Sequence, residues 1–332
     1  MTQNDKTILI LGESSDQSTS QVMDWIVFYG ATPLRINEYP KIKIKKIHIS
    51  NTSDDSYVIE INGKEVRSDD IYSYWYRRGY FTLLAPLPDL KELDKDVQHE
   101  LNYHLNQEIK ILEKGIHKIN ESKRSIGAFD TNSMNKLEVL MIAKRLGITI
   151  PETYVITHKK QFNDTGSKQK YITKAISEAL TFHKKKEDFT ESYVSYTEEV
   201  NDMESHTQFF PSLIQEKLDK HYELRIFYMH GEFYSMAIFS QNDSKTETDF
   251  RKYNNEKPNR NVPFSLPKEE AEKLHLLMIE LGLNTGSIDM VVTKDKQYVF
   301  LEVNPVGQFG MVSNPCHYKL EKRIAKYLTV HD

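Results

Sequence analysis

The chain has 332 residues, which is enough for one large domain or two to three small ones. Its formal net charge of −4, from 44 basic and 48 acidic residues, excludes the global basic field that is typical of nucleic-acid binding. Charged residues make up 28% and aromatic residues 11%, which indicates a globular protein and excludes a disordered one.

The chain contains one cysteine, Cys316, so it cannot form an internal disulfide. The pattern of a signal peptide, a basic stretch followed by a long apolar one, does not occur before the first expected strand at 7–12. Apolar stretches also stay well below the length of about 18 residues that a membrane span requires. We therefore expect a soluble, cytoplasmic protein with no nucleic-acid or membrane partner.

Residues 1–119 are predicted to form an N-terminal α/β domain. The expected elements are a helix at 18–30 and strands at 7–12, 33–37, 41–50, 57–66 and 71–78. The Asn62-Gly63 pair predicts a tight hairpin turn. Apolar residues recur at spacings of four and three from Leu93 to Leu112, which predicts a long helix that ends at Gly115.

The expected strand at 71–78 is rich in aromatic residues and ends in Arg77 and Arg78, followed by Gly79. Two arginines at the end of a strand can present cations to an anionic substrate group. The alternative is a surface pair that stacks on the neighbouring aromatic rings, and the sequence favours neither.

Residues 120–210 are predicted to form a central subdomain, and residues 211–332 a C-terminal one. The elements expected in the central part are a helix from Asn132 to Gly147, strands at 150–156, 170–175 and 193–199, and an exposed connection at 182–189. The elements expected after it are strands at 213–218, 222–229, 232–239, 286–292 and 298–304, helices at 267–282 and 318–328, and a polar loop at 241–263. A loop of that length in a compact domain is often functional.

The last pair of expected strands carries three oxygen donors. Glu302 and Asn304 are two residues apart on one strand and therefore project to the same face. A hairpin turn at 294–296 can bring Asp289 beside them. Three hard oxygen ligands on a rigid platform suit Mg²⁺, which keeps several waters and shares its site with substrate phosphates. The alternative is that Asp289 only ends a strand and that Glu302 is a solvated surface residue.

Three charged residues, Lys174, Glu223 and Arg225, interrupt strands that otherwise have the composition of a core. Such residues are seldom fully buried unless they are paired. A lysine beside a carboxylate-rich metal site suits a polyphosphate, and Arg225 and Arg251 can supply planar forks for phosphate oxygens. The P-loop and dinucleotide-binding glycine motifs do not occur, which excludes these two kinds of nucleotide site.

The order of these motifs resembles the ATP-grasp ligase superfamily. The matching motifs are Asn135-Lys136-Leu137, Lys174, Gln215-Glu216-Lys217-Leu218, Glu223-Leu224-Arg225, Gly286-Ser287-Ile288-Asp289 and Glu302-Val303-Asn304-Pro305. More narrowly, almost the whole chain resembles the microviridin-type graspetide synthetases, including the grasp-with-spasm peptide maturases. The narrower match rests on Trp75-Tyr76-Arg77-Arg78, Thr248-Asp249-Phe250-Arg251 and Asn304-Pro305-Val306-Gly307-Gln308-Phe309-Gly310.

The resemblance implies an ATP-grasp fold, in which a pre-grasp α/β domain precedes central and C-terminal domains and ATP lies between two antiparallel sheets. The implied Mg²⁺ ligands are Asp289, Glu302 and Asn304. The implied ATP-binding residues are Lys136 and Lys174 at the phosphates, the adenine-reading hinge Gln215, Glu216, Lys217 and Leu218, and Glu223 at the ribose. The implied catalytic residues are Arg225, Asp249 and Arg251, with Arg77 and Arg78 toward the substrate.

The implied activity is ATP-dependent macrocyclisation of a ribosomally made precursor peptide with a leader and a core. Asp or Glu carboxylates would become acyl phosphates and then ω-esters or ω-amides with Thr or Ser hydroxyls or Lys amines of the same peptide. Homodimerisation is also implied. Two alternatives stay open, namely a glutamate-adding type of amino-acid ligase and a non-catalytic peptide-binding module. In contrast to many ATP-grasp enzymes, residues 167–230 contain no glycine, so the loop over the triphosphate is not assigned.

Overall fold

The structure is a computed structural model that describes residues 6–37, 41–85, 90–91, 93–158, 170–177, 181–185, 190–194, 197–200, 208–240 and 259–330. The chain divides into two compact units. The first consists of Met1–Ser133, Leu283–Thr285 and Gln308–Asp332, and the second of Met134–Gly282 and Gly286–Gly307. The expected mixed α/β class is confirmed, whereas the three-region division of the chain stays a prediction.

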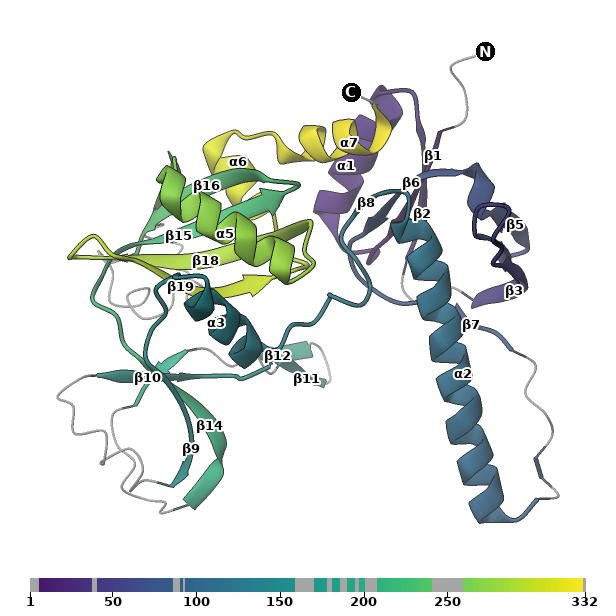
Figure 1. Ribbon diagram of the computed structural model, residues 1–332, viewed down its shortest axis with the longest axis horizontal. Helices are drawn as coiled ribbons and strands as arrows, with labels where there is room; N and C mark the ends of the chain where they lie inside the picture. The colour runs from purple at the N-terminus through teal and green to yellow at the C-terminus, as the bar shows by residue number, and fades with distance from the viewer. Residues whose placement is uncertain are drawn as a thin grey trace. The chain divides into compact units, whose positions relative to one another are not determined.

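The first unit is built on a parallel sheet with the strand order β2-β1-β6-β8. Its strands are β1 (Thr7–Leu11), β2 (Thr32–Ile36), β6 (Ile71–Tyr76) and β8 (Arg124–Ile126). Ile8, Leu9 and Ile10 are completely buried, as is usual for a central parallel strand. Helices α1 (Gln17–Phe28) and α7 (Leu320–Thr329) pack side by side and contact strands of this sheet (Figure 1).

A second sheet of the first unit has the order β5-β4-β3-β7. Its elements are β3 (Lys41–His48), β4 (Ser56–Ile61), β5 (Lys64–Arg67) and β7 (Thr82–Leu83), with the 3-10 helix η1 (Ser68–Asp70) after β5. Asn62 and Gly63 join β4 to β5 with φ values of 50° and 79°, which confirms the predicted hairpin turn. Lys43 and Lys45 both pair with Glu60, so the alternating lysines of β3 line a solvated face.

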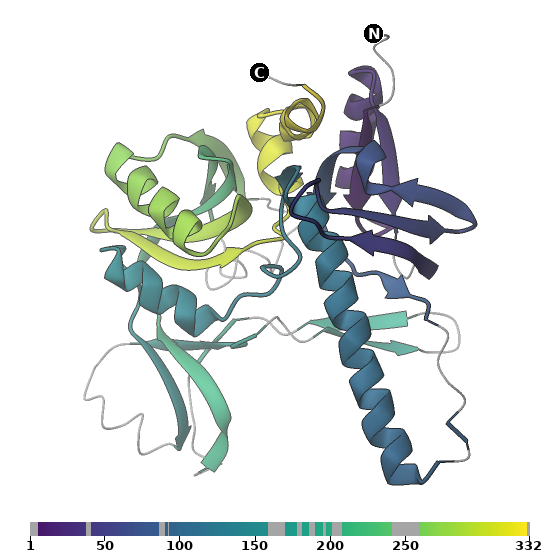
Figure 2. The same ribbon diagram turned by 45° about the vertical axis from the view of Figure 1, so that its right-hand side comes forward.

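Helix α2 (Lys95–Glu121) runs through Gly115, so the predicted end of this helix is wrong. A glycine inside a helix costs about 1 kcal/mol relative to alanine. Ile116 is completely buried and Ile119 nearly so, and burial of each such side chain stabilises by about 1.5–3 kcal/mol. Packing of this last part of α2 therefore outweighs the glycine. The N-terminal part of α2 extends away from the parallel sheet (Figures 1 and 2).

His117 on α2 lies in the core of the first unit and is completely buried. Its ring stacks between Phe81 and Phe129, with centroid distances of 4.5 and 4.1 Å and nearly parallel planes. The Tyr74 hydroxyl lies 2.8 Å from Nδ1, and a Glu113 carboxylate oxygen lies 3.9 Å from Nε2. Burial lowers the pKa of His117 despite the neighbouring carboxylate, so the folded chain holds this ring neutral.

This buried histidine predicts a loss of stability in mild acid. Below about pH 6.5 the unfolded chain protonates His117, whereas the folded chain does not, so the free energy of unfolding falls by at most about 1.4 kcal/mol per pH unit. Above that pH the contribution is fully present. Denaturant unfolding across this range measures the slope. His117→Gln should flatten the slope, whereas His99→Gln on the exposed part of α2 should leave it unchanged. An equal slope in the His117→Gln variant would contradict the assignment.

The second unit contains two sheets whose recorded strand pairs are antiparallel, in the orders β13-β10-β14-β9 and β17-β16-β15-β18-β19. The first comprises β9 (Thr153–His158), β10 (Tyr171–Lys174), β13 (Glu198–Glu199) and β14 (Gln208–Glu216). The second comprises β15 (Lys220–Met229), β16 (Glu232–Phe239), β17 (Arg260–Phe264), β18 (Thr285–Thr293) and β19 (Tyr298–Asn304). Helix α3 (Lys136–Arg145) packs on β19 and on α5 (Lys268–Glu280) (Figure 1).

Two predicted irregular segments contain strands instead. The expected exposed connection at 182–189 includes β11 (Thr181–Lys185), which pairs with β12 (Thr190–Val194). A lysine-rich strand has no apolar alternation to reveal it, because backbone hydrogen bonds alone form the pair. The expected loop at 241–263 ends in β17, which pairs with β16.

The helix boundaries also need correction. Helix α1 is capped by Asp16, which accepts hydrogen bonds from the backbone of Ser18 and Thr19, and not by the predicted 18–20 segment. A short helix, α6 (Gly310–Cys316), precedes α7 and was not predicted, because Pro315 within it disfavours a helix. Within the described residues, no helix combines the length and the apolar character that a membrane crossing needs.

Candidate active site

Asp289, Glu302 and Asn304 lie on one face of the five-stranded sheet. Asp289 on β18 is directly opposite Glu302 on β19, and Ser287 is directly opposite Asn304. Directly opposed residues of an antiparallel pair project to the same face, as do residues two apart on a strand. The structure therefore brings together the three oxygen donors that the sequence indicates.

A β-bulge in β19 produces this arrangement. Near the hairpin turn, Val291 pairs with Val299 and Met290 with Phe300. The same register carried one step further would place Leu301 opposite Asp289. Instead the register shifts between Asp289 and Met290, so that Glu302 is opposite Asp289. A one-residue shift moves side chains to the other face of a sheet, and bulges often occur beside active sites.

Asp289 forms an ion pair with Arg225, which comes from the neighbouring strand β15. Both side chains are largely buried. Arg225 also has a buried Nε–H without a hydrogen-bond partner among the described residues. A buried donor left unpaired costs about 1–3 kcal/mol, and such a cost at a polar site indicates a position where a ligand oxygen is bound.

Glu302 is paired with a second cation, Lys136. The Lys136 Nζ atom lies 3.1 Å from the Glu302 carboxylate and 3.4 Å from the carbonyl oxygen of Ala175. Lys136 is the first residue of α3, because the Asn135 side chain caps that helix. Ala175 follows the last residue of β10, so this lysine reaches from the five-stranded sheet to the end of the four-stranded one.

The donor set fits Mg²⁺. Two carboxylates and one amide oxygen are hard ligands, and Mg²⁺ is commonly held by one or two carboxylates together with waters and phosphate oxygens. The part of the chain that the structure describes contains no cluster of three or more His, Cys, Asp or Glu side chains suited to a metal. Such a nitrogen-rich or thiolate-rich cluster would suit zinc instead.

The predicted hinge at 215–218 connects the two antiparallel sheets of the second unit. The side chain of Gln215 is buried and donates to Thr153 Oγ1 at 2.9 Å. The backbone N–H of Glu216 donates to the Glu152 carbonyl at 2.9 Å, and that of Lys217 to the Lys170 carbonyl at 2.8 Å. This segment is therefore anchored on the four-stranded sheet before the chain enters β15.

The remaining predicted nucleotide-binding residues lie beside the hinge. Lys174, the last residue of β10, and Gln215 share one face of the sheet, since their opposite residues are Leu213 and Ile172. Lys217 pairs with Glu199 through its Nζ atom. Leu218 is half-buried. Contacts of these residues with a nucleotide stay predictions.

Glu223 is buried and already has two partners. Lys220 Nζ lies 2.5 Å and Ser240 Oγ 2.9 Å from the same carboxylate oxygen. Burial raises the pKa of Glu223, against the opposing effect of Lys220. The sequence analysis did not identify Lys220 or Ser240, because neither belongs to a recognised motif. A ribose contact of Glu223 stays a prediction. Asp249 and Arg251 lie outside the described residues.

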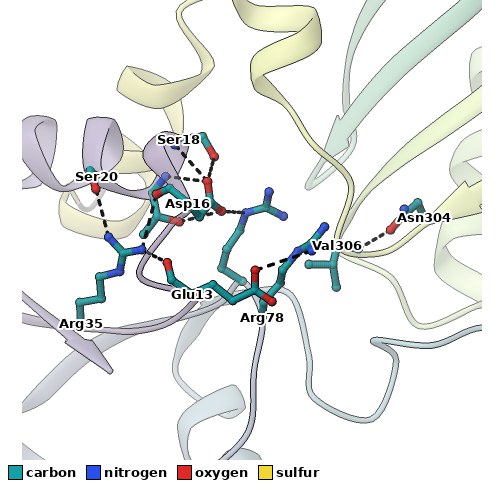
Figure 3. A network of polar contacts seen from close by, with 10 residues as sticks. Glu13, Asp16, Ser18, Ser20, Arg35, Arg78, Asn304 and Val306 are labelled. Carbon is teal, nitrogen blue, oxygen red and sulfur yellow. Dashed lines mark hydrogen bonds and ion pairs between the residues drawn. The ribbon is translucent and has the colours of Figure 1, made fainter. Parts of the chain in front are cut away.

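Arg77 and Arg78, in the first unit, differ from each other. Arg77 is 5% exposed and its Nε donates to Asp16 at 2.9 Å, so the alternative of a surface pair is wrong for this residue. Asp16 also receives hydrogen bonds from Ser18 (Figure 3). Arg78 is partly exposed, with its guanidinium 3.9 Å from Glu13. Arg77 thus holds the loop between β1 and α1, whereas Arg78 is open to solvent.

Comparison with known proteins places this site in a known architecture. A RiPP-associated ATP-grasp ligase from Chryseobacterium gregarium, solved with ADP and a leader and core peptide, is 23% identical with a TM-score of 0.72 over 98% of this chain and 95% of that one. The macrocyclase MdnC from Microcystis aeruginosa, solved with its precursor peptide MdnA, is 26% identical with a TM-score of 0.70 over 97% and 99%. The chain has the ATP-grasp fold.

A third ATP-grasp neighbour, the macrocyclase MdnB from Microcystis aeruginosa, is 22% identical with a TM-score of 0.69 over 98% of this chain and 100% of that one. No model of a protein family matches the sequence, and no curated protein matches it. The expected ATP-grasp fold and the expected resemblance to microviridin-type graspetide synthetases are therefore confirmed by structure, along nearly the whole chain.

Proposed function

We propose that this protein is an ATP-dependent peptide macrocyclase that joins Asp or Glu side chains of a ribosomally made precursor peptide to Thr or Ser hydroxyls or Lys amines of the same peptide. The observation that carries the proposal is the alternation of charge on one sheet face, where Arg225 meets Asp289 and Lys136 meets Glu302. This arrangement provides metal ligands and phosphate-binding cations in one place. The similarity to MdnC, a macrocyclase solved with its precursor peptide, supports the choice of substrate.

The cofactors of the proposed reaction are ATP and Mg²⁺. Asp289, Glu302 and Asn304 would hold the metal, which supplies positive charge at the transferred phosphate. Without ligands, Arg225 and Lys136 neutralise two of these three side chains. A cation that replaces them at the carboxylates leaves both basic side chains available to phosphate oxygens. The same two residues thus prevent repulsion between the carboxylates before binding and neutralise phosphate after it.

The chemistry proceeds in two steps. A substrate carboxylate oxygen attacks the γ-phosphorus of ATP, and ADP leaves, which gives an acyl phosphate. A hydroxyl or amine of the same peptide then attacks the acyl carbon, phosphate leaves, and the nucleophile loses its proton. The Arg225 guanidinium is placed to stabilise charge on the transferred group in both steps. Because both reacting groups belong to one bound peptide, proximity also favours ring closure.

The finer parts of the proposal concern partners and place. We include Arg78, the exposed arginine of the first unit, as a contact for substrate carboxylates. We also include a homodimer, which the partly exposed apolar side chains on and before α2 favour, such as Val97 and Leu112 at 50% and 41% exposure. A cytoplasmic location suits the use of ATP. Light scattering of the purified protein tests the dimer.

Mass spectrometry tests the activity. The protein is incubated with Mg²⁺, ATP and the precursor peptide encoded beside its gene, and with free glutamate as a competing acceptor. The expected result is the loss of one water per crosslink within the peptide, without mass gain. Addition of glutamate would instead identify an amino-acid ligase. No covalent change together with tight peptide binding would identify a binding module.

A further inference from the structure

The chain turns sharply directly after the metal-ligand candidate Asn304. The backbone N–H of Val306 donates to the Asn304 side-chain oxygen at 3.1 Å, and that of Gly307 donates to the Asn304 carbonyl at 3.1 Å. The first bond is typical of an Asx turn, which fixes the orientation of the side-chain amide. An amide oxygen has two lone pairs, so one stays available for a metal.

Gly307 of this turn presses against Ser287 on β18. A Cβ atom at Gly307 would lie 2.1 Å from Ser287 Oγ, 2.2 Å from its Cβ and 2.9 Å from its backbone nitrogen. Its φ angle is not in the left-handed region, so glycine is needed here for space and not for conformation. On the other side, a Cβ at Gly286 would lie 3.3 Å from the Asn304 carbonyl oxygen.

Ser287 is completely buried, and its hydroxyl has no hydrogen-bond partner among the described residues. It lies opposite Asn304 and two residues before Asp289, on the face that carries the metal ligands. A small side chain is therefore held between Gly307 and the strand although its polar group contributes no bond. Close contact of the turn with β18 is the property that this pair of small residues provides.

We infer that Ser287 and Gly307 are positioning residues that hold the Asn304 amide oxygen at the metal site. The inference rests on the proposed function, since it takes Asn304 as a Mg²⁺ ligand. Any enlargement of either residue lifts the turn from β18 and displaces the amide oxygen from the two carboxylates. Residues that orient a metal ligand typically change metal affinity about 10–100-fold when they are altered.

The test measures metal binding and not catalysis. ADP binding is followed by calorimetry while Mg²⁺ is titrated, and Mn²⁺ bound in the presence of ADP is followed by electron paramagnetic resonance. Ser287→Thr adds one methyl group in a fully buried place, and Gly307→Ala adds one at the turn. We expect both variants to need at least about 10-fold more Mg²⁺ for half-maximal ADP binding and to change the Mn²⁺ spectrum.

Three variants serve as comparisons. Ser287→Ala removes the unpaired hydroxyl without adding volume, and Gly310→Ala adds a methyl where no atom lies within 4 Å, so both should keep the normal Mg²⁺ requirement. Ser287→Gly combined with Gly307→Ala should recover part of the loss. Folded Ser287→Thr and Gly307→Ala proteins with unchanged Mg²⁺ requirements would overturn the inference. Absence of Mg²⁺-dependent ADP binding in the unaltered protein would instead overturn the proposed function.

Discussion

Replacing Glu302 by glutamine is expected to reduce ATP turnover at least about 100-fold, because it removes one of the two carboxylate charges at the proposed metal site. The change also leaves Lys136, 3.1 Å from that carboxylate, without its ion-pair partner. Phosphate release measured over a range of Mg²⁺ concentrations checks the result. A higher Mg²⁺ requirement should accompany the loss.

Asp295→Asn is the matched control for the Glu302 variant. Asp295 lies in the exposed turn between the same two strands, and its replacement also removes one negative charge. Turnover of this control should equal that of the unaltered protein. If Glu302→Gln retains turnover within a few fold, the acid is a solvated surface residue and the metal site must be sought elsewhere.

Replacing Arg225 by glutamine is expected to reduce peptide crosslinking about 10³-fold while ADP and Mg²⁺ still bind, since an arginine on a transferred phosphate commonly contributes 10³ or more to the rate. Arg225→Lys should recover little, because an ammonium group cannot replace a planar guanidinium with several donors. Mass spectrometry of the peptide measures crosslinking, and calorimetry measures nucleotide binding.

Arg260→Gln provides the control for this variant, since Arg260 is an exposed arginine in the same sheet. Thermal melting with Mg²⁺ and ADP shows whether each variant is folded. Equal losses of ADP binding and crosslinking in Arg225→Gln would show that the residue holds the nucleotide and not the transferred group.

Local patterns predicted much of the second unit correctly. The β-branched and aromatic runs of β15, β16, β18 and β19 are strands, and His230-Gly231 joins the first two as expected. These predictions succeeded because strand alternation and turn chemistry depend on residues near one another in sequence. The lysine-rich β11 and the end of α2 failed for the opposite reason, as both are stabilised by partners distant in sequence or by backbone pairing.

The amino-acid sequence by itself determined the kinds of chemical group at the site: two carboxylates and an amide on adjacent strands, with basic residues on neighbouring elements. Only the tertiary structure decided how they meet. The bulge that sets Glu302 opposite Asp289, the cation assigned to each carboxylate and the burial of Arg77 all depend on register and packing. Register and packing arise from contacts between distant segments, and such contacts leave no periodic signal in a single sequence.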